Sequence, residues 1–303
     1  MSAVVSLTMV AETLRIAVPY ACAAVAGIWS ERSGIINIAL EGVLLASAFA
    51  SVAAAHATGS AAVGLAAGVA AGALVSVFHA QIVERARVDA VLSGIAINLL
   101  AYAGTRLALR GLYESASNSP SIDAFRLGPT GASGAALLGR VLADPVTILA
   151  AAAVALTPLA LFRTRFGLHA RASGDDPVAA AAAGVDVPRT RVLALAVSGA
   201  ICALGGVHLA FDQHRFESGM SNGRGFIALA AVVVSGWRAG RALLACVCFG
   251  ALEALQIVLQ DELHRSAGAE LLQIVPFAAT LVVLAFAAGR GAAPRGLGKF
   301  ADG

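Results

Sequence analysis

Residues 31–42 read ERSGIINIALEG, and no further Asp, Glu, Lys or Arg follows before Glu84. A lipid-facing helix would not carry two glutamates, an arginine and an asparagine, and a water-exposed loop would not lead into so long an apolar run. One environment accepts both features. Inside a membrane helix bundle, irregular backbone and polar side chains are shielded by protein or line a cavity.

The composition of the whole chain also indicates a membrane protein. Of its 303 residues, 59% are hydrophobic and 13% are charged, whereas a soluble domain carries about 25% charged residues. Too little polar surface is therefore present to cover a globule in water. Glycine and alanine are abundant, as in closely packed membrane helices, and the alternating pattern of membrane β-strands is absent. We predict an all-α, polytopic membrane helix bundle with a single domain over residues 1–303.

Apolar runs between polar breaks predict about nine transmembrane helices, at 4–28, 35–56, 61–83, 90–109, 145–162, 192–211, 226–237, 242–259 and 271–288. With nine crossings, the arginine-rich loops and the basic C-terminal segment all fall on one side. Because cytoplasmic loops are enriched in Lys and Arg, we assign that side and the C-terminus to the cytoplasm. The expected location is the plasma (inner) membrane of the cell, and the N-terminus lies outside.

The largest connection on the arginine-rich side, at about residues 163–191, contains a complete short helix. Asp176 is expected as its N-cap and Pro177 as its first residue, and five alanines lead to a terminating Gly184. Asp175 adds negative charge near the positive end of the helix dipole. A helix of two turns is marginal alone in water, so either a partner protein grips it or it is an ordinary ordered loop.

The opening stretch predicts a broken helix. Gly34 permits irregular backbone over ERSG, and Asn37 and Glu41, four residues apart, would share one helix face towards the interior. That face would line a translocation path. Alternatively, Glu41 would form a buried hydrogen-bonded clamp to an arginine or to backbone amides. We favour the clamp for Glu41 and the path for Asn37.

A second discontinuity, SGMSNGRG at 218–225, precedes the short span 226–237. Two glycine-interrupted segments in the two halves are expected of inverted repeats, whose interface forms the pathway. Arg224 would bind a helix C-terminus or a solute, or would be a loop arginine at headgroup level. Asn98 and Glu253 belong to further polar stripes, which interhelical hydrogen bonds explain more readily than ligand contacts.

Several stretches together resemble one protein family. GLHARASGDDPVAAAAAGVDVPRTRVLALAVSGAICALGG (167–206) is similar to the cytoplasmic coupling segment of ATP-binding-cassette importer permeases of the branched-chain amino acid/ribose-type family. ERSGIINIALEG, VDAVLSGIAINLLA (88–101), SGMSNGRGFIALAAVVVSGW (218–237) and APRGLGK (293–299) resemble its nucleoside and simple-sugar subgroup. Two departures, VLL where a methionine-rich stretch is usual and RAG where a proline is common, leave the solute open.

The resemblance implies a permease that forms half of a two-subunit pore for nucleosides or related simple sugars. A partner ATPase would bind the coupling segment, a second and related permease would complete the pore, and an extracytoplasmic binding protein would deliver the solute. The implied ATPase contacts are Gly174, Asp175, Asp176, Pro177, Ala180, Ala181 and Gly184. The expected pathway residues are Asn37, Glu41, Asn98, Arg224 and Glu253. Arg110, Arg126 and Arg140 would either dock acidic residues of the binding protein or be solvated surface charges.

Several kinds of chemistry are not indicated. A Walker A pattern is absent, so ATP and Mg²⁺ would bind the partner ATPase and this chain would hold no cofactor. Catalytic constellations are absent too, and the four cysteines lie in apolar segments without the clustered ligands of a metal site. We expect neither an enzyme nor a binder of nucleic acid polymers. An ion-coupled secondary transporter and a non-transporting scaffold are the alternatives.

Overall fold

The computed structural model describes residues 7–125, 128–129, 133–262, 274–287 and 293–300. Within these ranges every regular element is a helix, and the isolated β-bridge between Asn118 and Glu217 is the only extended pairing. The prediction of an all-α protein is confirmed.

Twelve helices follow one another along the described chain. They are α1 (Leu7–Arg32), α2 (Leu40–Thr58), α3 (Ala61–Ala86), α4 (Ala90–Tyr113), α5 (Gly134–Ala143), α6 (Pro145–Arg163), α7 (Arg165–Asp175), α8 (Pro177–Ala182), α9 (Val187–Asp212), α10 (Arg224–Ser235), α11 (Ala239–Glu262) and α12 (Val275–Ala287).

Seven of these helices, namely α1, α2, α3, α4, α6, α9 and α11, are long and apolar enough to cross a membrane. The chain is thus a polytopic membrane helix bundle, as predicted. The other two predicted spans, 226–237 and 271–288, correspond to α10 with 12 residues and α12 with 13. Part of the second span lies outside the described residues. A full crossing needs about 20 residues, so within the described residues seven helices reach that length, and α10 and α12 are shorter apolar helices at the positions of the other two predicted spans.

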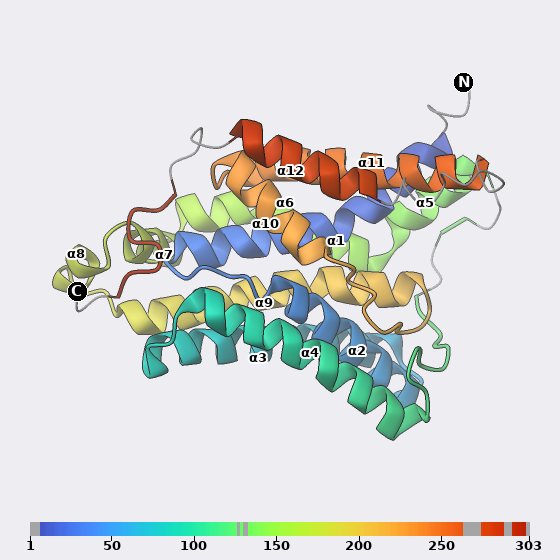
Figure 1. Ribbon diagram of the computed structural model, residues 1–303, viewed down its shortest axis with the longest axis horizontal. Coiled ribbons are helices and arrows are strands. Elements are labelled where there is room, and N and C mark those ends of the chain that lie inside the picture. The colour runs from blue at the N-terminus through green and yellow to red at the C-terminus, as the bar shows by residue number, and fades with distance from the viewer. Residues whose placement is uncertain (1–6, 126–127, 130–132, 263–273, 288–292, 301–303) are drawn as a thin grey trace.

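The long helices run side by side, with α1 and α9 at the centre of the bundle (Figure 1). Burial reflects this position: 61% of the apolar stretch of α1 and 67% of that of α9 are buried, against 22–28% in α3, α4, α6 and α11. The outer helices present large apolar side chains outwards, such as Leu74, Leu99 and Leu107, which are 67–73% exposed. An outer surface of this kind suits contact with lipid.

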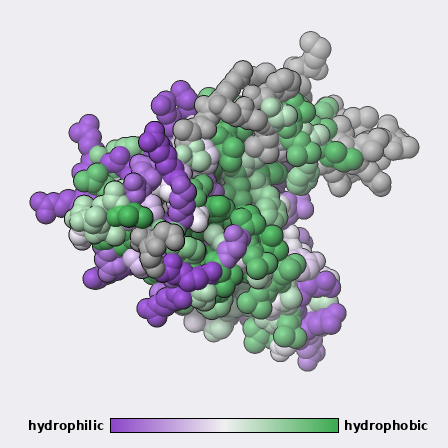
Figure 2. All heavy atoms as spheres, turned by 60° about the vertical axis from the view of Figure 1, so that its left-hand side comes forward, coloured by the Kyte–Doolittle hydropathy of each residue, from purple (hydrophilic) through white to green (hydrophobic). Residues whose placement is uncertain are grey.

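The two ends of the bundle differ. We call one end the α8 end; it carries α7, α8, residues 293–300 and the connections after α3 and α10 (Figure 1). We call the opposite end the α5 end; it carries α5 and the start of α1 (Figure 1). Hydrophilic side chains gather over the α8 end, and a hydrophobic band covers the bundle behind it (Figure 2). The arginine-rich segments therefore lie together on one side of the hydrophobic band.

Glycines set the closest helix contacts. A Cβ atom on Gly199 of α9 would lie 2.3 Å from the carbonyl oxygen of Gly72 in α3, and one on Gly68 would lie 2.4 Å from a methyl group of Val207. Only glycine lets the two backbones approach this far. Close backbone approach replaces the hydrophobic effect as a source of helix association in lipid, so these glycines hold α3 against the central α9.

Replacing Gly199 by alanine should separate α3 from α9, because the added methyl group meets backbone rather than a flexible side chain. We expect a loss of about 1–3 kcal/mol, typical of overpacking, seen as a lower thermal unfolding temperature of the purified protein in detergent. Gly104→Ala is the matched control, since nothing lies within 4 Å of its new Cβ atom. Equal unfolding temperatures of the two variants would contradict this account of the packing.

Candidate functional site

Helix α1 ends in a complete glycine-terminated turn. Gly34 has φ +104°, its N–H donates to the carbonyl of Glu31 at 3.0 Å, and the N–H of Ile35 donates to that of Ser30 at 3.1 Å. This is the Schellman pattern, with Gly34 in the left-handed position. The break was expected over ERSG, but Glu31 and Arg32 are still helical. The irregular backbone is 33–39 instead, because the left-handed position falls at Gly34.

The break also corrects the expectation for Asn37. Helix α2 begins only at Leu40, so Asn37 precedes the helix and does not share a helical face with Glu41. Asn37 is fully buried, its amide nitrogen lies 3.5 Å from the hydroxyl of Ser198, and its Oδ1 atom has no hydrogen-bond partner. In this conformation Asn37 is therefore enclosed by protein, and it lines neither of the two cavities described below.

Side chains of other helices satisfy the exposed backbone of the break. Asn98 of α4 donates to the carbonyl of Ile38 at 2.9 Å and accepts from the N–H of Gly42 at 2.7 Å. His79 of α3 lies 3.2 Å from the carbonyl of Ile36 through its Nε2 atom. Asn98 is thus an interhelical clamp on both flanks of the start of α2, although it also lines a cavity described below.

Glu41 joins α2 to α10. Its two carboxylate oxygens accept hydrogen bonds from the N–H groups of Gly223 at 2.8 Å and Gly225 at 2.7 Å. These amides belong to the first turn of α10, whose partial positive charge attracts a carboxylate. A Cβ atom on Gly225 would lie 2.5 Å from the backbone nitrogen of Glu41. Glycine is therefore required where the two helix starts touch.

Helices α2 and α10 both begin inside the bundle rather than at one of its ends (Figure 1), and for that reason alone we call them half-helices, although α2, with 19 residues, is long enough to cross a membrane. Residues 33–39 lead from the α8 end to the start of α2, and residues 213–223 lead from the α5 end to the start of α10 (Figure 1). The two starts meet well away from both ends, and each half-helix then runs towards the opposite end from the other. The two discontinuities predicted from the sequence are thus in contact.

Arg224 and Glu253 form an ion pair beside this contact. The guanidinium of Arg224 binds one carboxylate oxygen of Glu253 and donates to the carbonyl of Met220 at 3.0 Å, and the hydroxyl of Tyr20 donates to the other oxygen of Glu253 at 2.7 Å. Their side chains are 15% and 16% exposed. Arg224 is therefore largely buried and paired within the bundle.

Two cavities flank the turn at 219–223. One, of about 330 Å³, is lined by Tyr20, Asn222, Arg224, Ile227, Glu253, Gln256, Ile257 and Phe277. The other, of about 210 Å³, is lined by Glu41, Gly42, Leu45, Asn98, Tyr102, Gly219, Ser221, Asn222 and Gly223. Asn222 borders both, so the turn is the partition between them. Its backbone is held in left-handed conformations at Gly219, Asn222 and Gly223, with φ between 45° and 77°.

The structure thus brings together four of the five predicted pathway residues, Glu41, Asn98, Arg224 and Glu253, around the start of α10. Asn37 lies apart from both cavities. Sequence reasoning missed Tyr20 and Asn222, which border the same cavities. Asn222 lay within the glycine-rich stretch that predicted the break, whereas an isolated tyrosine within an apolar helix gave no signal.

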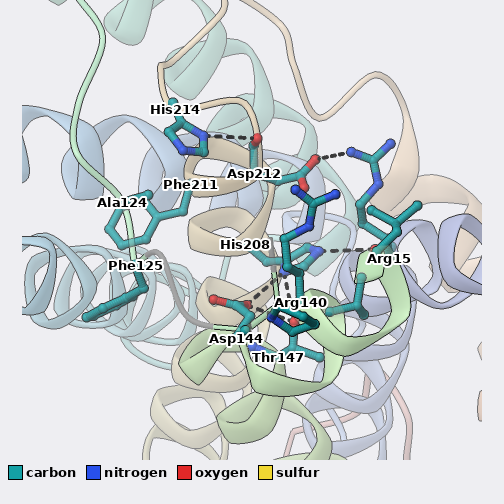
Figure 3. A pocket seen from close by; sticks show the side chains of 14 residues that line it. Arg15, Ala124, Phe125, Arg140, Asp144, Thr147, His208, Phe211, Asp212 and His214 are labelled. Carbon is teal, nitrogen blue, oxygen red and sulfur yellow. Dashed lines mark hydrogen bonds and ion pairs between the residues drawn. The ribbon is translucent and has the colours of Figure 1, made fainter. Parts of the chain in front are cut away.

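A further polar pocket lies at the α5 end (Figure 3). It measures about 440 Å³ and includes Arg140, Asp144, Thr147, His208 and Asp212 in its lining. Burial alone would raise the pKa of Asp144, but the His208 ring, 3.6 Å away, and hydrogen bonds from Thr147 outweigh burial and lower that pKa below its usual value.

The three arginines expected to dock a binding protein have different positions. Arg140 is exposed at the rim of this pocket, and Arg110 is exposed in the last turn of α4. Arg126 lies outside the described residues.

The short helix predicted after Asp176 is confirmed as α8. The Asp176 side chain accepts from the N–H of Ala179 at 3.0 Å, Pro177 is the first helical residue, and Gly184 has φ +85°. Asp175 is the exposed last residue of α7, a helix that the sequence reading treated as loop. Pro177 and Ala180 are buried, while Ala181 and Gly184 are exposed. One face of α8 is therefore held by the protein itself and the other is free.

Multi-pass helices, with two half-helices whose starts meet between polar cavities, are the architecture of a membrane transport protein. Residues 9–284 match the family model described as branched-chain amino acid transport system/permease component, and the chain belongs to this family. It is a permease subunit rather than an enzyme, and the resemblance in the sequence is confirmed. An ion-coupled secondary transporter is not favoured.

Relatives are similar over nearly the whole chain. The guanosine ABC transporter permease protein NupQ of Bacillus subtilis is 34% identical, covering 96% of this chain and 95% of the relative. The nucleoside ABC transporter permease protein NupC of Lactococcus lactis is 30% identical, covering 95% and 94%. The putative glucose ABC transporter permease protein TsgC13 of Haloferax volcanii is 29% identical, covering 85% and 84%.

Glu41→Gln should weaken the contact between the half-helices, because it replaces one of the two accepting oxygens by an NH2 group that cannot accept and it removes the charge. Hydrogen bonds to charged groups contribute about 1.5–3 kcal/mol, so we expect a clearly lower thermal unfolding temperature in detergent. The control is Glu12→Gln, which removes only a partly exposed ion pair with Arg15 and should cost about 1 kcal/mol or less. A Glu41 variant as stable as the control would show that this contact is dispensable.

Proposed function

We propose that this chain is the transmembrane permease subunit of an ATP-driven importer for nucleosides or related simple sugars. Its full-length similarity to permeases named for guanosine, nucleosides and glucose supports this solute class. The observation that carries the proposal is the contact of two half-helix starts through Glu41, between two cavities.

The lining of the cavities suits an uncharged polar solute. Arg224 and Glu253 neutralise each other, so the larger cavity carries no net charge to attract an ion. Tyr20, Asn222 and Gln256 offer hydrogen-bonding groups for hydroxyl and amide groups, and Phe277 offers an aromatic face. Polar side chains that fix orientation, beside an aromatic face, are a usual combination in small-molecule sites.

In the proposed mechanism the partition at 219–223 separates the two cavities in one state and shifts in the other. Glu41 ties the starts of α2 and α10 together, so a displacement of either half-helix moves the partition. Alternating access of this kind is a rocking of one repeat against the other around a fixed site. The chain supplies the path and its closure, and affinity for the solute resides mainly in a separate binding protein.

The energy for this movement would come from a partner ATPase, which holds the ATP and the Mg²⁺. Its contact on this chain would be the coupling segment, through the exposed Asp175, Asp176, Ala181 and Gly184, while the buried Gly174, Pro177 and Ala180 would hold that segment against the bundle. The exposed apolar face of α8, with Val178 53% exposed, supports docking into a groove of that partner. A second, related permease would complete the pore. Arg110, Arg126 and Arg140 would meet acidic groups of the binding protein outside the cell.

Uptake assays test the function directly. Proteoliposomes would carry this permease with the ATPase, second permease and binding protein of its own transporter, without any ion gradient. We expect import of labelled guanosine only with internal ATP, with competition by other nucleosides and not by leucine. Vesicles without this chain are the control. Import that follows a proton or sodium gradient in the absence of ATP would contradict the proposal.

The proposed orientation in the plasma membrane places α8 and the C-terminus in the cytoplasm. A cysteine at Ala181, in a background with the exposed Cys248 replaced by serine, should react with a membrane-impermeant maleimide in inside-out vesicles and not in intact cells. The matched control is Ala135→Cys, an exposed residue of α5 at the opposite end, which should label from outside. The reverse pattern would overturn the assigned topology.

A further inference from the structure

One buried side chain connects four separate segments at the α8 end. Arg191, in the second turn of α9, donates to the carbonyl of Ser33 at 2.9 Å, of Ser173 at 3.1 Å and of Lys299 at 2.8 Å. It also pairs with Glu84 of α3 at 2.8 Å, and the two side chains are 1% and 6% exposed. Only the five-donor fork of an arginine serves four acceptors at once.

Residues 293–300, here the C-terminal strap, run between the coupling segment and the helix break. The N–H of Gly296 donates to the carbonyl of Gly174 at 2.8 Å, and the N–H of Gly298 donates to the carbonyl of Gly34 at 2.9 Å. The strap lies against α7 and α8 (Figure 1). At its far end, the guanidinium of Arg87 lies 4.6 Å from the ring centre of Phe300.

The backbone around the strap is packed so tightly that even a Cβ atom does not fit at two of its glycine contacts. A Cβ atom on Gly296 would lie 2.6 Å from the ring of Pro177, the first residue of α8, and 2.9 Å from the carbonyl oxygen of Gly174. One on Gly174 would lie 2.2 Å from the carbonyl oxygen of Arg32. The coupling segment, the strap and the end of α1 are therefore in backbone contact, and one cannot move far without the others.

The contacts of the strap and Arg191 also bear on the position of α2. Ser33 and Gly34, which Arg191 and the strap hold, begin the irregular segment 33–39 that leads directly into α2 and Glu41. Only residues 35–39 separate Gly34 from the start of α2, so a displacement at Gly34 would act directly on that helix.

We infer that Arg191 and the C-terminal strap form a transmission joint. It converts a displacement of α8 into a displacement of the helix break, and through α2 into a movement of the Glu41 contact with α10. The strap is thereby a working part of ATP coupling, and Arg191 is a positioning residue that acts through the carbonyls it holds. This inference rests on the proposed function, since it takes an ATPase at α8 as the source of the displacement.

The test is the number of solute molecules imported per ATP hydrolysed by the complete, reconstituted transporter. Gly296→Ala pushes the strap away from α8, and Arg191→Lys keeps a charge for Glu84 but loses the fork. For both we expect continued assembly with the ATPase and continued ATP hydrolysis, with import per ATP reduced about tenfold, as for the loss of one buried contact. Phe300→Ala loosens only the end of the strap and should give a smaller loss.

The matched control is Gly240→Ala, at the start of α11, whose new Cβ atom meets nothing within 4 Å. It should keep the wild-type import per ATP. If the role of these residues were only structural, the three variants would have a lower yield and a lower unfolding temperature, but the complexes that assemble would keep the wild-type import per ATP. That result for Gly296→Ala, Arg191→Lys and Phe300→Ala would overturn the inference. Failure of the wild-type transporter to couple import to ATP would instead overturn the proposed function.

Discussion

A helix that is interrupted inside a bilayer exposes backbone N–H and C=O groups where no water can satisfy them. The structure of this permease depends on how the break at 33–39 meets that constraint. Its carbonyls are bound by His79, Asn98 and Arg191, from three different helices. These polar residues inside an apolar bundle are thus the partners that make an irregular segment possible, and they also fix its position.

Glu41 extends the same principle to the second half-helix. The start of α10 has free N–H groups, and the carboxylate that satisfies them comes from the first turn of α2. Each half-helix therefore completes the other, and the glycine at 225 lets their backbones touch. The contact between the two helix starts is also the place where two cavities meet, so Glu41 lies where the helix packing and the proposed path coincide.

The α8 end shows how such a site can respond to a distant partner. At this end, Arg191 and the C-terminal strap bind the start of the helix break at Ser33 and Gly34. They also bind the coupling segment, at Ser173 and Gly174. A continuous series of packed backbone contacts therefore runs from the exposed face of α8 to Glu41. The series includes the irregular segment 33–39, whose carbonyls are hydrogen-bonded by His79, Asn98 and Arg191.

The fold class, the short helix α8 and the approximate positions of the two helix breaks were determined by the sequence alone. Composition specified a helical membrane protein, the Asp176, Pro177 and Gly184 signals specified α8, and two glycine-rich stretches marked the breaks, because these features act locally along the chain. Which side chains meet was decided only by the tertiary structure. Glu41 lies 182 residues from Gly223, and Arg191 lies 158 residues from Ser33, so no periodicity or spacing could pair them. Asn37 was misplaced for the same reason: a helical face was assumed where the fold ends one helix at Gly34 and begins the next at Leu40.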